Sequence, residues 1–197
     1  MPKVSEQHRL DRQDEIIDAA LVAFRRKGFQ ATSMAEIIAE SGLSAGAIYG
    51  YFGSKSDIIL AVATKIVAAR IVDLEHLARL DPLPEPAKVV RILLDGLLDS
   101  LGRPAVLLQV WGEAATDPAL LTLCSDIFTQ LRDALGNYLT HWDGSQHGMS
   151  EAEARRVASE QAPLFVSAVQ GFIVQDSLFT DFDRESYLTA TLRYLPR

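Results

Sequence analysis

Two tyrosines and a lysine lie close together in the stretch IYGYFGSK, residues 48–55. A tyrosine hydroxyl can donate to a phosphate oxygen, and its ring can contact a sugar or a thymine methyl group. Lys55 stands where a helix is expected to begin, so its charge can add to free backbone amides in holding a phosphate. Tyr49, Tyr51 and Lys55 are therefore candidate phosphate-contacting residues; the alternative is that both tyrosines only pack a small domain.

Three short helices are expected to position these groups. Apolar residues over 16–24 repeat at helical spacing, and Gly28 follows them as a C-terminal cap. Ser33 and Glu36 form a capping box that starts a second helix over about 33–41. Ser44 starts a third, over 44–52, after a Gly-Leu link. Two short helices joined by such a turn make a helix-turn-helix, whose second helix can enter the major groove of DNA.

The run TSMAEIIAESGLSAGAIYGYFGSK, residues 32–55, resembles the DNA-binding domain of TetR-type transcriptional regulators. The resemblance covers residues 13–60. It implies a ligand-responsive regulator, a repressor by analogy, that binds an inverted-repeat operator in double-stranded DNA as a homodimer and responds to a small, largely apolar effector. It also implies phosphate or base contacts at matching positions: Ser33, Ser44, Tyr49, Tyr51 and Lys55.

This chain departs from many members of that family along the third helix. Small residues stand where relatives carry a basic, a polar and a larger side chain, at Ala45, Ala47 and Gly50. Gly46 and Gly50 lie on one helix face, and each costs about 1 kcal/mol relative to alanine. The nearly bare strip allows close backbone approach to DNA or to the first helix. Readout is then expected to depend on methyl contacts and DNA shape at Ala45, Ala47 and Gly50.

The formal net charge of −7 is unevenly distributed. Residues 1–56 carry seven basic and seven acidic residues, whereas 12 basic residues face 19 acidic ones beyond residue 56. An acidic body repels a polyanion. Contact with nucleic acid is therefore expected only in the first quarter of the chain.

Helical periodicity continues to the end of the chain, which predicts an all-α fold of about nine helices. The fourth is expected from Ser54 to about Leu80. Later helices are expected over about 87–101, from Pro104, from Pro118, over 150–179 with a kink at Pro163, and over 183–195, with a loop at DGSQHG after Trp142. Residues 1–54 are predicted to form the helix-turn-helix DNA-binding domain, and residues 55–197 a helical effector-binding and dimerisation domain.

Residues 163–174, PLFVSAVQGFIV, are apolar nearly all round. One face is expected to pack on its own core and the other on a partner subunit, as in the two-fold four-helix interface that the resemblance implies. The alternative is a central helix enclosed by its own domain. The expected dimer residues are Val166, Val169, Ile173, Leu188 and Leu192.

Aromatic and apolar residues with a few polar groups could line a pocket for the effector, or equally form solid core. The candidate ligand-binding residues are Leu107, Leu108, Trp111, Phe128, Phe165 and Gln170. Gln109 and Glu113 are possible orienting groups.

Catalytic and membrane functions find little support in the sequence. The four histidines are scattered, Cys124 lies on an apolar helix stripe, and no cofactor or metal is expected. No run of about 18 apolar residues is found, so a cytoplasmic protein without a membrane partner is expected. A helical enzyme and a helical interaction module that does not bind DNA remain the alternatives.

Overall fold

The computed structural model describes residues 6–195, except for the side chain of Leu192. Over this range the chain forms nine helices and no strand, which confirms the predicted all-α fold. The helices are α1 (Glu6–Lys27), α2 (Met34–Ser41), α3 (Ala45–Tyr51), α4 (Lys55–Leu77), α5 (Pro86–Leu101), α6 (Ala105–Ala114), α7 (Pro118–His147), α8 (Glu151–Leu178) and α9 (Arg184–Tyr194).

The predicted helix starts are confirmed by their capping geometry. The capping box at Ser33 is complete, and Ser44 accepts a hydrogen bond from the Ala47 amide. Ser54 forms a second capping box, with Asp57. Gly42 closes α2 in the left-handed region at φ 66°.

Two boundaries differ from those predicted. α4 ends at Leu77 rather than near Leu80. The expected loop at DGSQHG is instead the last turn of α7, which continues to His147 and ends at Gly148 with φ 63°. The composition of this stretch favours a loop, yet it stays helical, and Asp143 within it is buried.

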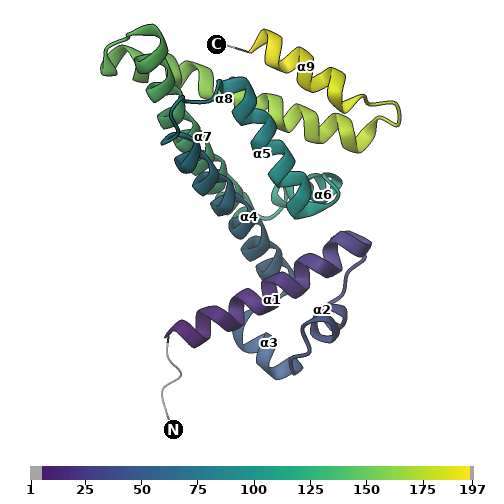
Figure 1. The fold of residues 1–197 in the computed structure, drawn as a ribbon. Helices are drawn as coiled ribbons and strands as arrows, with labels where there is room; N and C mark the ends of the chain where they lie inside the picture. Colours follow the sequence, from purple (N-terminus) through teal and green to yellow (C-terminus); the bar gives the residue numbers. More distant parts are fainter. Residues whose placement is uncertain (1–5, 196–197) are drawn as a thin grey trace.

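α1, α2 and α3 form a small unit at one end of the molecule, and α4 leads from it into the remaining helices (Figure 1). α8 has an 18-residue window with a mean hydropathy of 1.2, long and apolar enough to be compared with a membrane span. It packs along α7, and its Phe165, Phe172 and Ile173 are buried in the protein. Only 28% of that window is buried, so part of the apolar surface of α8 faces away from the core of the subunit.

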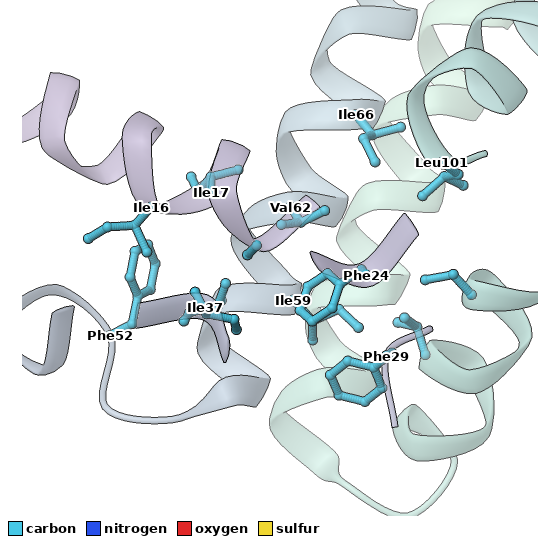
Figure 2. Close-up of a cluster of buried hydrophobic side chains, with 14 of the residues drawn as sticks. Ile16, Ile17, Phe24, Phe29, Ile37, Phe52, Ile59, Val62, Ile66 and Leu101 are labelled. Carbon is cyan, nitrogen blue, oxygen red and sulfur yellow. The ribbon is translucent and has the colours of Figure 1, made fainter. Parts of the chain in front are cut away.

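One hydrophobic cluster crosses the boundary expected after residue 54. Figure 2 shows Phe24, Ile37 and Phe52 of the N-terminal unit packed near Ile59 and Val62 of α4. The same cluster continues to Leu101 of α5, Val106 and Val110 of α6, and Ile173 of α8. α4 and α6 therefore share one packed core with the helix-turn-helix.

Candidate DNA-binding surface and internal pocket

α3 has one face toward the core and one toward solvent. Ile48 is fully buried and anchors the helix on the hydrophobic cluster, whereas the next residue, Tyr49, is 52% exposed. Ala45 and Gly50 are exposed beside it, and Ala47 is half-buried. Tyr51 is half-buried and packs against the hydrophobic cluster, so the packing alternative holds partly for Tyr51 and not for Tyr49.

The glycines of α3 face outward. A Cβ placed on Gly46 or Gly50 would meet no atom within 4 Å, so neither glycine is needed to let α3 approach α1. The face of α3 that carries Gly46 and Gly50 was expected to approach either DNA or the first helix, and the first helix is thereby excluded. What remains is an open helix face that an external molecule can approach to backbone distance.

α2 is held to α1 by polar contacts. Ser33 Oγ and Glu36 share the capping box, and Lys27 of α1 donates a hydrogen bond to Glu36. That hydrogen bond, with those from Ser33, lowers the pKa of Glu36 to about 2. Arg26 pairs in the same way with Glu40 at 2.9 Å. The last two cations of α1 thus form ion pairs with acids of α2 at the protein surface.

Lys55 has partners within its own chain. Its Nζ donates to the backbone oxygens of Phe29 and Thr32 at 3.0 Å and of Gln30 at 3.3 Å. It also lies 4.4 Å from the centre of the Phe29 ring. Because an ammonium has three N–H donors, these carbonyls can occupy all of them. The geometry therefore favours a role in fixing the α1–α2 loop over the expected phosphate contact.

Lys55→Met is expected to lower the free energy of unfolding by about 1.5–3 kcal/mol, because the half-buried carbonyls of Phe29 and Thr32 and the exposed carbonyl of Gln30 lose a charged donor. The slope of operator affinity against salt should stay unchanged, since no phosphate contact is removed. Chemical denaturation and DNA titration at several salt concentrations measure both quantities. Lys88→Met, at an exposed site on α5, is the control. A salt slope reduced by about one with unchanged stability would restore the phosphate role.

A largely apolar cavity of about 110 Å³ lies between the N-terminal unit and the C-terminal helices. α4 lines it from Ile59 to Arg70, α1 contributes Leu21 and Phe24, and α5, α6, α7 and α8 supply the remaining walls. Of the residues expected to bind ligand, four are on its wall: Leu107, Trp111, Phe128 and Gln170. The Trp111 and Phe128 rings are 5.9 Å apart.

Two expected pocket residues lie elsewhere, and several lining residues were not expected. Phe165 is fully buried in a second hydrophobic cluster, and Leu108 faces a surface hollow near Lys55. Phe24 and Arg70 are among the lining residues that sequence reasoning missed. The sequence did contain a signal for Arg70, because this charged residue lies within the apolar face of a long helix.

The expected dimer residues are turned inward. Val166, Val169 and Ile173 line the cavity, and Leu188 belongs to the second cluster. Ile173 and Leu188 are only 2% and 3% exposed within one subunit, so they offer no surface to a partner. The side chain of Leu192 lies outside the described part of the chain. Among the described residues of this region, the large exposed apolar side chains are Leu164, Leu178, Phe179 and Tyr194.

Comparison with known proteins agrees with this arrangement. Residues 16–62 match the family described as bacterial regulatory proteins, tetR family. The HTH-type transcriptional regulator YfiR of Bacillus subtilis (strain 168) is 46% identical over 57 residues, which are 29% of this chain and 28% of that protein. A TetR transcription regulator from Haloarcula marismortui ATCC 43049 shares the fold with a TM-score of 0.68 and 19% identity, over 93% of this chain and 94% of that chain.

The fold of GusR from Salmonella enterica is similar over 98% of this chain and 97% of that chain, with a TM-score of 0.63 and 18% identity. The sequence match to YfiR covers little more than a quarter of that protein, and the family match, over residues 16–62, includes the helix-turn-helix. The structural matches, by contrast, cover nearly the whole chain. Residues 16–62 thus match the helix-turn-helix DNA-binding domain of the tetR family, and the solved structures show that the whole chain shares the fold of TetR regulators.

Proposed function

We propose that this protein is a cytoplasmic, ligand-responsive repressor that binds an inverted-repeat operator as a homodimer and changes its DNA affinity when a small, largely apolar molecule occupies the cavity. The observation that carries the proposal is the position of α4. Its first turn holds the α1–α2 loop through Lys55, and its next turns line the cavity from Ile59 to Arg70. A ligand that shifts α4 must therefore shift the DNA-binding unit.

α6 gives a second connection between cavity and DNA-binding unit. One side of this short helix lines the cavity with Val110 and Trp111. From the same helix, Gln109 Oε1 accepts hydrogen bonds from the backbone amides of Phe29 at 3.1 Å and Gln30 at 3.2 Å. The loop that Lys55 holds from α4 is thus also held from α6. An occupant that moves either helix would strain the same loop.

The proposed DNA contacts come from the exposed face of α3 and the N-termini beside it. Tyr49 supplies a hydroxyl and a ring, Ser33 and Ser44 mark helix N-termini, and Gly50 permits close backbone approach. Ala45 and Ala47 are proposed to contact thymine methyl groups. In a two-fold dimer, the two α3 helices would enter major grooves about 34–36 Å apart or a larger helical-turn multiple.

The dimer interface is proposed to include the exposed apolar residues of α8 and the residue after it: Leu164, Leu178 and Phe179. Leu164 is 52% exposed on α8, so a charge there is compatible with the folded subunit. Leu164→Asp is expected to convert the dimer to a monomer at micromolar concentration and to weaken binding to an inverted repeat by at least 10-fold.

Sedimentation of the full chain, combined with selection of a duplex from a random DNA pool, tests this proposal. The expected results are a dimer and a selected sequence with two-fold symmetry. Leu121→Asp, at an equally exposed site on α7, should remain dimeric. A wild-type protein that is monomeric and selects no sequence would overturn the proposed function.

A further inference from the structure

Arg70 stands out on the wall of the cavity. Among the described residues lining it, Arg70 is the single charged one, and nearly all the others are aliphatic or aromatic. Its side chain is 15% exposed, and its Nε and Nη1 atoms are fully buried. A guanidinium keeps its positive charge under all ordinary conditions, so a permanent cation lies in this part of the cavity wall, with its Nε and Nη1 atoms covered by protein.

The guanidinium is incompletely satisfied. Nε lies 2.9 Å from Oδ2 of Asp73, one turn further along α4, but in a direction that does not make a hydrogen bond. Nη1 has no acceptor in the described part of the chain. Burying a donor without a hydrogen-bond partner costs more free energy than one formed hydrogen bond contributes to stability. A functional state in which an acceptor reaches Nη1 would remove that cost.

Gly96 of α5 makes room for this group. A Cβ on Gly96 would lie 1.8 Å from Nη1 of Arg70 and 2.6 Å from its Cζ. The guanidinium therefore occupies the space that any other residue at position 96 would fill. The position of the Arg70 guanidinium, on α4, is therefore set in part by Gly96, on α5.

We propose that the ligand of this cavity is a small amphipathic monocarboxylate whose carboxylate accepts hydrogen bonds from Arg70 and whose apolar body extends along α4 toward α1. This inference rests on the proposed function only in using the same cavity. A planar carboxylate matches the donor geometry of a guanidinium. Asp73 already supplies one negative charge beside Arg70, which favours a singly charged ligand group over a doubly charged phosphate.

The cavity sets the shape of the apolar body. From Arg70 to Ile59 its wall follows α4 for 11 residues, or roughly 16 Å at the rise of an α-helix. At the end opposite Arg70 it reaches Leu21 and Phe24 of α1. Its volume of about 110 Å³ is below the roughly 150 Å³ of a cavity that holds benzene, so an eight-carbon chain can enter only if the surrounding helices move apart. A narrow, unbranched chain fits this space better than a fused ring system.

Octanoate and octan-1-ol test the inference, because they share a chain length and differ in charge. Binding can be followed by the fluorescence of Trp111 in a Trp142→Phe background, since the chain has two tryptophans. Wild-type protein is expected to bind octanoate at least 10-fold more tightly than octan-1-ol. Arg70→Met, which keeps the apolar stem, should weaken octanoate binding by about 10- to 100-fold and leave octan-1-ol binding unchanged.

Gly96→Ala gives an independent variant, because it keeps the charge but displaces the guanidinium. It should also reduce the preference for octanoate, while Arg79→Met, at an exposed site beyond α4, should not. Thermal unfolding checks that each variant is folded. Equal binding of the two compounds to wild-type protein, no binding of octanoate, or a preference that survives both Arg70→Met and Gly96→Ala would overturn the inference. These measurements contain no DNA, so they stand apart from the test of the proposed regulator.

Discussion

Replacing Gly46 and Gly50 together with alanine is expected to stabilise the protein and, at the same time, to weaken its binding to operator DNA. Each glycine costs a helix about 1 kcal/mol relative to alanine, and each faces open space, so the added methyl groups meet nothing in the protein. The free energy of unfolding should therefore rise by roughly 1–2 kcal/mol. Two methyl groups on a closely approached face should lower operator affinity by about 10-fold or more.

Gly136→Ala is the matched control for this double variant. Gly136 lies inside α7, and a Cβ there would also meet no atom within 4 Å. It should give about the same stabilisation per glycine with no change in DNA affinity. Denaturation curves and fluorescence anisotropy of a labelled operator measure the two effects. A double variant that binds operator as tightly as wild-type protein would show that the bare face of α3 is not the face that approaches DNA.

Local chemistry explains why much of the fold could be predicted from the sequence. Capping by Ser33, Ser44 and Ser54 depends on neighbours within a few residues, and all three helices begin where expected. The last turn of α7 was missed because its composition favours a loop, whereas burial of Asp143 depends on how the helix packs. Such packing depends on the tertiary structure, and it produces no periodic pattern in the sequence.

In the candidate site, too, local features could be predicted from the sequence and tertiary contacts could not. An outward face on α3 could be predicted, because Ile48 and Phe52 mark the opposite, apolar side. The partners of Lys55 could not, since the carbonyl oxygens that it contacts belong to a loop 23–26 residues earlier. Val169 and Ile173 were assigned to a partner subunit because an apolar helix has no visible inner side in sequence. The pairing of Arg70 with Gly96 exists only between two helices.

Ala63→Leu is expected to fill the cavity and abolish binding of its ligand while leaving binding of the unliganded protein to DNA largely intact. Ala63 lies on the cavity wall, on the part of α4 between the DNA-binding unit and Arg70. Three added carbon atoms occupy a substantial part of a cavity of about 110 Å³. Affinity for octanoate and octan-1-ol should both fall at least 100-fold, and operator affinity should stay within about threefold.

Ala68→Leu is the control for cavity filling, since Ala68 is exposed on the same helix and does not line the cavity. It should bind both compounds as wild-type protein does. Overpacking can cost about 1–3 kcal/mol, so a thermal melt must accompany the binding data. If Ala63→Leu is folded and still binds either compound with wild-type affinity, that compound binds outside the cavity.

The most direct test of a ligand-responsive regulator is a titration of the selected operator with wild-type protein, in the absence and in the saturating presence of a compound that perturbs Trp111. Coupling between the two sites of about 1–3 kcal/mol should lower operator affinity by about 5- to 150-fold. The effect should disappear in Ala63→Leu. An operator affinity that is the same with and without the bound compound would contradict coupling between the cavity and the DNA-binding surface for that compound.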